Sequence, residues 1–257
     1  MHRQAGYVYE GITVQLYDEW FGSQPHEDQL FYEQFIRQGN GPALEIGSGT
    51  GRLLLPYLQN NLEVHGVEPS PQMMSVCQEK AEQLGLQPTI YQQYMQALKI
   101  PYSYKTIFIP LCTFQLLVSR QEVLEALRRF YLHLERDGQL LISLFMPTVQ
   151  MLKETQGVWS IRRSITRPHD NTQITLSEAI QRNYFEQIET KWLKYEVYKE
   201  SQLVTSYVKT VQLRWYNWHE FKMILEKVGF RNVRMYGNYT HLEASEKNDV
   251  IVFSTQK

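Results

Sequence analysis

A short segment near residue 45 combines an acidic side chain with closely spaced glycines. It reads ALEIGSGTGRLLLPYL over residues 43–58, and Glu45 lies in the short apolar run that precedes the glycines. Three glycines follow at alternate positions: Gly47, Gly49 and Gly51. Glycines in a strand-to-helix turn let the backbone approach a ligand, and the helix N-terminus offers it unpaired N–H groups. Glu68 ends the next apolar run about twenty residues later, where a carboxylate can bind ribose hydroxyls. The pattern predicts a nucleoside site.

The spacing of the glycines separates two classes of nucleoside cofactor. The motif G-x-G-x-x-G is typical of dinucleotide sites. This turn reads G-x-G-x-G instead and has Arg52 at the position of the third glycine. An acid at Glu45 would repel a pyrophosphate but attract an ammonium group. The pattern favours an ammonium-bearing nucleoside. A nicotinamide-type nucleotide-dependent oxidoreductase stays open as an alternative, as does a non-catalytic cofactor-binding relative that acts through a protein partner.

Strand and helix patterns alternate through most of the chain. Seven apolar runs are typical of strands: residues 42–47, 62–69, 89–93, 105–111, 139–145, 231–236 and 249–254. Helical spacing marks the segments between or around them: residues 26–38, the stretch after Gly51, and residues 71–84, 120–136 and 217–230. Ser70 is a good N-cap, and Asn217 and Glu220 have capping-box spacing. The alternation predicts an α/β fold with a doubly wound, mainly parallel sheet.

The alternation is interrupted at residues 147–215. This stretch has period-2 patterning and few helical signals, which indicates an antiparallel sheet inserted after the fifth strand. We therefore expect three parts: residues 1–38 as an N-terminal aromatic lid or helix, residues 39–146 with 214–257 as the cofactor-binding core, and residues 147–213 as an inserted sheet for acceptor binding or dimerisation.

Four segments together resemble a known superfamily. LEIGSGTG resembles the first motif of class I S-adenosylmethionine-dependent methyltransferases, and VHGVEPSPQMM resembles their second-strand segment. FIPLCTFQLL is similar to the fourth-strand motif, and YNWHEFKMILEKVGF to the late helix before the two closing strands. The resemblance covers about residues 40–146 and 214–254, in the family's order and spacing. It implies a Rossmann-like sheet of seven strands, parallel except for an antiparallel closing strand, and S-adenosyl-L-methionine as cofactor, with S-adenosyl-L-homocysteine as product.

The resemblance also assigns cofactor contacts to single residues. Gly47 and Gly49 would pack against the methionine part of the cofactor, and Glu45 would lie near its ammonium group. Glu68 would bind the ribose hydroxyls, and Met73 would lie against the adenine. Further expected contacts are Tyr17, Ser48, Arg52, Pro69, Met95 and Leu111. Arg52 has two open interpretations, a surface residue or a ligand of the cofactor carboxylate.

The third-strand motif departs from the family pattern. Many members carry an acid there that reaches the adenine amino group, whereas this chain has Tyr94 followed by Met95. A backbone N–H at Met95 is the expected substitute for that contact.

The N-terminal segment is rich in aromatic residues: Tyr7, Tyr9, Tyr17, Trp20 and Phe21. Tyr17 and Asp18 resemble a pair often found where an N-terminal segment of small-molecule methyltransferases closes over the cofactor. We expect a lid here, although core packing is the alternative.

Methyl transfer is an in-line displacement, so the enzyme mainly has to align the acceptor and exclude water. Thr113, Gln115 and Tyr17 are the candidate catalytic residues, and Thr113 and Gln115 are expected nearest the methyl group. PLCTFQ replaces the Asn/Asp-Pro-Pro-aromatic motif of enzymes that methylate amide or base amino groups. A small molecule, methylated on N or O, is therefore the expected acceptor.

Composition narrows the classes of partner. The net charge is −1 and basic residues form no block, which disfavours a nucleic-acid partner. There is no apolar run of membrane-spanning length and no signal peptide, so we expect a cytoplasmic protein without a membrane partner. The two cysteines, Cys77 and Cys112, are expected to be reduced, and the histidines have no metal-ligand spacing, so no metal is expected. Either a monomer or a homodimer is expected.

Overall fold

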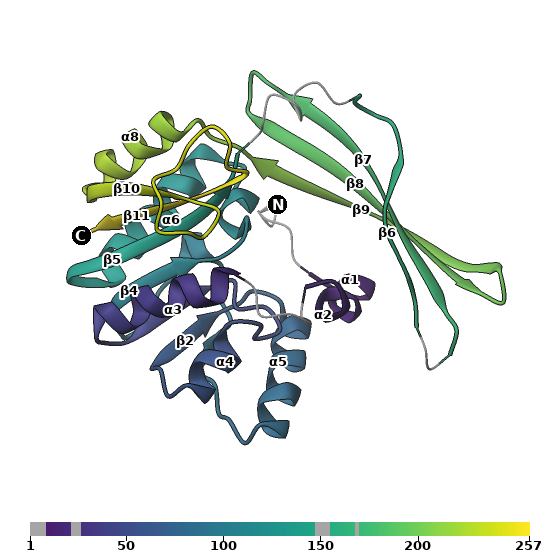
Figure 1. The fold of residues 1–257 in the computed structure, drawn as a ribbon, viewed down its shortest axis with the longest axis horizontal. Helices are drawn as coiled ribbons and strands as arrows, with labels where there is room; N and C mark the ends of the chain where they lie inside the picture. Colours follow the sequence, from purple (N-terminus) through teal and green to yellow (C-terminus); the bar gives the residue numbers. More distant parts are fainter. Residues whose placement is uncertain (1–8, 22–26, 147–154, 168–169) are drawn as a thin grey trace. The chain divides into compact units, whose positions relative to one another are not determined.

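A computed structural model describes residues 9–21, 27–146, 155–167 and 170–257. The chain divides into two compact units, which we describe separately (Figure 1). The larger unit combines Met1–Met146 with Tyr216–Lys257, and the smaller is Pro147–Trp215. Within the described residues, no helix is long and apolar enough to cross a membrane.

The larger unit is built on a seven-stranded sheet. Its strands are β1 (Ala43–Ile46), β2 (Val64–Val67), β3 (Ile90–Tyr91), β4 (Tyr104–Ile109), β5 (Leu134–Phe145), β10 (Arg231–Gly237) and β11 (Val250–Gln256). Their order is β3-β2-β1-β4-β5-β11-β10 (Figure 1). β11 alone runs opposite to the other six strands, antiparallel to its neighbours β5 and β10. The predicted fold class, including the antiparallel closing strand, is confirmed.

Helices cover both faces of this sheet. They are α3 (Glu27–Gly39), α4 (Leu54–Gln59), α5 (Pro71–Gln83), α6 (Arg120–His133) and α8 (Trp218–Val228), with the short 3-10 helices η1 (Met95–Ala97) and η2 (Thr113–Leu116). Two short helices, α1 (Ile12–Gln15) and α2 (Tyr17–Phe21), precede them. The Ser70 hydroxyl accepts a bond from Met73 N at 3.2 Å, and Asn217 and Glu220 form a capping box, as their spacing predicts.

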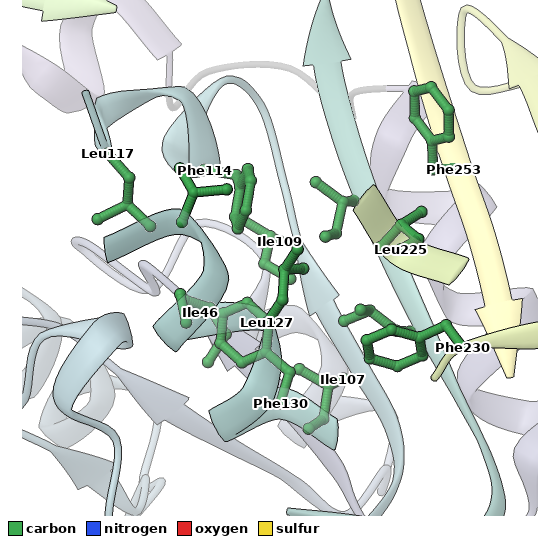
Figure 2. Packing of buried hydrophobic residues seen from close by; sticks show 14 of the residues in the cluster. Ile46, Ile107, Ile109, Phe114, Leu117, Leu127, Phe130, Leu225, Phe230 and Phe253 are labelled. Carbon is green, nitrogen blue, oxygen red and sulfur yellow. The ribbon is translucent and has the colours of Figure 1, made fainter. Parts of the chain in front are cut away.

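Two hydrophobic cores lie on the opposite faces of the sheet. Successive side chains of a strand point to opposite faces, and Ile107 and Ile109 join one core while Phe108 joins the other. The first core is covered by α6 and α8, and the second by α3, α4 and α5. Figure 2 shows Leu127 and Phe130 of α6 packed close to Ile107 and other residues of the first core. The sheet is therefore covered on both faces, and its strand ends are left to form a site.

Several predicted boundaries differ from the structure, and two of them show why. The helix expected to reach residue 136 ends at His133, because Leu134 is already extended and pairs with Tyr104 of β4. The ladder then shifts register, and Asp137 takes a left-handed φ of 59° beside Gly138. The third strand, expected over residues 89–93, is limited to Ile90–Tyr91. In both places, the boundary follows the pairing with a neighbouring strand and not the helix or strand preference of the local sequence.

The smaller unit is the antiparallel sheet expected after β5. Its strands are β6 (Ser160–Thr166), β7 (Gln173–Asn183), β8 (Ile188–Lys199) and β9 (Gln202–Arg214), in the order β6-β7-β8-β9. Acids and bases of this sheet pair both between adjacent strands and within one strand. Arg182 Nε lies 2.7 Å from a Glu189 carboxylate oxygen, and Lys191 Nζ lies 3.2 Å from the other.

Candidate cofactor site

The turn between β1 and α4 contains three glycines with left-handed backbones. Their φ angles are 79° at Gly47, 55° at Gly49 and 81° at Gly51. A Cβ at Gly47 would lie 2.6 Å from Thr113 Cγ2, and one at Gly51 would lie 2.6 Å from Cys77 Sγ. At Gly49, by contrast, the nearest described side-chain atom would be Met73 Cε at 3.6 Å. Packing therefore requires the outer two glycines, while the middle one faces a space that a ligand can enter.

Glu68 connects this turn to the start of α5. Its carboxylate is buried and accepts bonds from Gly49 N at 3.0 Å and from Ser70 N at 2.8 Å. Burial raises the pKa of Glu68, and the two backbone N–H groups partly offset that rise. Each carboxylate oxygen has a second lone pair, so the group can still accept bonds from hydroxyls.

Two buried polar atoms beside the turn lack partners among the described residues. They are Glu45 Oε2 and Ser48 Oγ, on side chains that are almost fully buried. Burial raises the pKa of Glu45 well above its usual range, and the positive charge of Arg52 is the main opposing influence. Leaving such an oxygen unpaired is costly, and a bound ammonium group would satisfy it. These residues fit the methionine end of S-adenosylmethionine.

Ser48 packs over Gly66, in the middle of β2. A Cβ at Gly66 would lie 2.6 Å from Ser48 Oγ, so this strand position requires a glycine. The sequence analysis did not single out Gly66. The signal was available, because a glycine inside a strand pattern often marks a close approach of another part of the chain.

Arg52 forms a buried two-bond ion pair. Its Nη1 and Nη2 donate to Asp28 Oδ1 and Oδ2 of α3, at 3.0 and 2.6 Å. The side chains of Arg52 and Asp28 are 9% and 3% exposed, which corrects the surface interpretation of Arg52. The other interpretation, that Arg52 binds the cofactor carboxylate, stays a prediction. Its guanidinium already pairs with Asp28. Asp28 was missed, because an acid at the start of a predicted helix is usually explained by the helix dipole.

The N-terminal segment is tied to the glycine turn and to α5. Asp18 accepts a bond from Thr50 Oγ1 at 2.6 Å and pairs with Lys80 Nζ at 3.0 Å. The backbone oxygen of Tyr9 accepts a bond from Ser70 Oγ at 2.6 Å, and Gly11 N donates to Gln72 Oε1 at 2.6 Å. These contacts hold the segment beside the site. Tyr7 and residues 22–25 lie outside the described residues, and closure over a cofactor stays a prediction.

Tyr17 lies among the site's charged groups. Burial raises its pKa to about 12, and the charges of Arg52, Glu45 and Glu68 all act on its hydroxyl. The structure thus brings together the N-terminal tyrosine and both acids, as the expected site requires.

The segment after β4 contains three predicted site residues. Thr113 lies against Gly47 and so borders the glycine turn, and its place nearest the methyl group stays a prediction. Gln115 is 2% exposed and its amide bonds both backbone groups of Phe145, accepting from N at 2.7 Å and donating to O at 3.1 Å. These two hydrogen bonds indicate a structural role for Gln115. Its predicted place nearest the methyl group gains no support from them. Leu111 has a left-handed φ of 53°, which is rare for a branched side chain.

The three residues expected beside adenosine differ in their surroundings. Met73 is 1% exposed and borders the space at Gly49. Pro69 is half-buried between β2 and α5. Met95 opens η1 and is half-buried against the first core, and its contact with the adenine stays a prediction.

Residues 43–138 match a family model described as a methyltransferase domain. A protein of Geobacillus sp. (strain WCH70) named as a methyltransferase is 29% identical over 133 residues, which cover 50% of this chain and 54% of that protein. The chain thus spans about half the length of this relative. YqeM of Bacillus subtilis (strain 168), also named as a methyltransferase, is 20% identical over 97% of both chains.

Solved structures share the fold at low sequence identity. An S-adenosylmethionine-dependent methyltransferase from Clostridium acetobutylicum ATCC 824 superposes with a TM-score of 0.78 at 14% identity, covering 94% of this chain and 96% of that one. The CcbJ methyltransferase from Streptomyces caelestis gives 0.77 at 21% identity, covering 94% of each. CalS10 from Micromonospora echinaspora, solved with S-adenosylmethionine bound, gives 0.72 at 13% identity over all of both chains.

The strand order, the open glycine turn and its two buried acids agree with these matches. Residues 43–138 are thus similar to a methyltransferase domain, and the chain has the fold of S-adenosylmethionine-dependent methyltransferases.

Proposed function

We propose that this protein transfers a methyl group from S-adenosyl-L-methionine to a nitrogen or oxygen atom of a small molecule. The observation that carries the proposal is the buried Glu45 Oε2, which has no partner among the described residues and belongs to the strand that leads into the glycine turn. An ammonium-bearing ligand would satisfy this oxygen, whereas a pyrophosphate would be repelled by it. The arrangement therefore supports this cofactor over a dinucleotide.

Five residues would hold the cofactor. Gly47 and Gly49 would lie along its methionine part, and Glu45 would bind its ammonium group. Glu68 would accept bonds from the ribose hydroxyls, and Met73 would pack against the adenine. When bound, the cofactor supplies a methyl group on a sulfonium, which is an activated leaving group.

The chain's own task is then to align the acceptor and exclude water. Alignment of two reactants can supply roughly 7–11 kcal/mol of the barrier reduction. Thr113 lies against Gly47, so it would border the reacting centre. The N-terminal segment, tied to Thr50 and Lys80 through Asp18, would shield that centre from solvent.

A small acceptor is favoured by the charge balance and suggested by two structural relatives. The net charge of −1 and the lack of a block of basic residues in the sequence disfavour a nucleic-acid acceptor. KedS8 from Streptoalloteichus sp. ATCC 53650, with a TM-score of 0.74 at 14% identity over 100% and 99% of the two chains, is named a sugar N-methyltransferase. CalS10 is named an amino pentose methyltransferase. Amino sugars and their hydroxyl counterparts are therefore the first acceptors to screen.

The first test is calorimetric titration with S-adenosylhomocysteine, with NADH as the comparison ligand. We expect one-site binding of S-adenosylhomocysteine alone. Gly49→Val should abolish this binding while the circular dichroism spectrum is retained, because its side chain would fill ligand space. Gly85→Val is the matched control, since Gly85 also has a left-handed φ, 68°, and no described atom would lie within 4 Å of its Cβ.

Three results would contradict the proposal. Binding of NADH in place of S-adenosylhomocysteine would favour the oxidoreductase alternative. Wild-type affinity in Gly49→Val would mean that the glycine turn does not cradle the cofactor. A cofactor-binding protein that methylates no amine or hydroxyl acceptor would point to the non-catalytic alternative.

A further inference from the structure

The turn after β4 sets where Thr113 meets the glycine turn. β1 and β4 are parallel neighbours, so both turns leave the same edge of the sheet. A Cβ at Gly47 would lie 2.6 Å from Thr113 Cγ2. The two turns are therefore packed so closely that no side chain fits at Gly47. Leu111 takes a left-handed φ of 53° at the start of this turn, so the turn needs outside support to keep its shape.

The end of β5 supplies support at both ends of the turn. At its start, the fully buried Ser143 hydroxyl donates to the backbone oxygen of Leu111 and lies 3.2 Å from that of Ile109. At its other end, the Gln115 amide exchanges two bonds with the backbone of Phe145, at 2.7 and 3.1 Å. Residues 111 and 115 are therefore both fixed to one strand, with Thr113 between them.

Two buried tyrosines lie near the Ser143 hydroxyl. Burial raises the pKa of both Tyr32 and Tyr239, and the nearby Ser143 hydroxyl partly offsets both rises, although Tyr239 Oη has no hydrogen-bond partner among the described residues. Tyr32 donates weakly to the backbone oxygen of Ile109, at 3.5 Å. Because Ser143 is fully buried, water does not compete for its bond with Leu111.

We propose that Ser143 and Gln115 are positioning residues, which clamp the Leu111–Gln115 turn to β5 so that Thr113 stays against Gly47. Neither side chain has to touch the substrate, because both act through Thr113. This inference rests on the proposed methyl transfer for its catalytic consequence. The clamp itself can be tested without any acceptor.

Cys112 provides the acceptor-free probe, because it lies inside the clamped turn and is partly exposed. The only other cysteine, Cys77, is fully buried and serves as the internal standard. In Ser143→Ala we expect a thiol reagent to modify Cys112 about tenfold faster, because a loosened turn would expose its half-buried thiol more fully, with Cys77 unchanged. Peptide mass spectrometry identifies which cysteine has reacted.

Thr255→Val is the matched control. Thr255 is also buried, and its hydroxyl donates to a strand backbone oxygen, that of Arg231, at 2.7 Å. It should leave Cys112 labelling and kcat within about twofold of wild type, although its melting temperature should also fall. In Ser143→Ala we expect kcat with the best acceptor to fall about tenfold, while the Kd for S-adenosylhomocysteine changes less than about threefold.

Equal Cys112 labelling rates in Ser143→Ala and Thr255→Val would overturn the clamp. If Ser143→Ala does not fold, Gln115→Glu provides the second test, because it keeps the acceptor for Phe145 N and loses the donor to Phe145 O. A wild-type protein that binds no S-adenosylhomocysteine would overturn the proposed function, and the labelling rates would still decide on the clamp.

Discussion

The two units of this protein use buried charge in different ways. In the larger unit, buried charges gather at the glycine turn, and one carboxylate oxygen there, Glu45 Oε2, has no partner among the described residues. In the inserted sheet, the buried acids Glu178 and Glu189 are paired with bases, among them Arg182 and Lys191. Both units therefore contain buried acidic side chains, and the difference is whether every carboxylate oxygen has a partner.

This difference separates a binding site from a structural network. A buried charge that is paired stabilises the arrangement of its own strands, and it leaves little for a ligand to bind. A buried carboxyl oxygen without a partner costs stability until something binds it. Glu45 belongs to the second kind, so we assign the site to the larger unit on its chemistry as well as on its motif.

The largest expected effect comes from breaking one ion pair in each unit. Asp28→Asn and Glu189→Gln should each lower the free energy of unfolding by about 3–5 kcal/mol, because each removes the negative charge that faces a buried arginine. Only Asp28→Asn should also weaken binding of S-adenosylhomocysteine, since its partner Arg52 directly follows the glycine turn. Urea denaturation and calorimetry measure the two quantities.

Glu189→Gln tests the comparison most directly. A weaker affinity for S-adenosylhomocysteine in this variant would mean that the inserted sheet contributes to the cofactor site, and the proposed division of roles would fail.

The second effect contrasts two glycines with similar backbones. Gly51 has φ 81°, and a Cβ added there would clash with Cys77. Gly157 of the inserted unit has φ 75°, and no described atom would lie within 4 Å of a Cβ added there. Gly51→Ala should cost about 2–5 kcal/mol of stability, the sum of the left-handed backbone and overpacking. Gly157→Ala should cost only about 1–2 kcal/mol, from the backbone alone. Equal losses in urea denaturation would show that packing at the glycine turn is looser than these distances indicate.

The smallest effect concerns the pH dependence caused by Glu45. Its raised pKa means that the folded chain holds a proton that the unfolded chain releases, so stability falls as pH rises from about 4.5 through the folded pKa. Glu45→Gln should reduce this slope, because the variant cannot ionise at that position. Its affinity for S-adenosylhomocysteine should weaken by about 1–3 kcal/mol. Thermal melts between pH 4.5 and 8 measure the slope, and an unchanged slope together with unchanged affinity would remove Glu45 from the site.

Local signals were sufficient for much of the fold. The glycine spacing, the alternating strands and the helix caps at Ser70 and Asn217 depend on residues close together in the chain, and the structure has them as expected. The boundary at His133 could not be predicted, because it depends on the pairing of Leu134 with Tyr104, thirty positions away by number.

The same division holds for the site. Glu45, Glu68 and the three glycines were determined by the sequence itself, since the chemistry of a nucleoside site requires acids and glycines at fixed places around two strand ends. The pairing of Arg52 with Asp28, the two bonds of Gln115 and the clamp by Ser143 were decided only by the tertiary structure. The reason is physical, because a side-chain hydrogen bond depends on a few ångströms of distance and on direction. Those are set by how β5 and α3 pack against the turns, and no spacing along the chain records them.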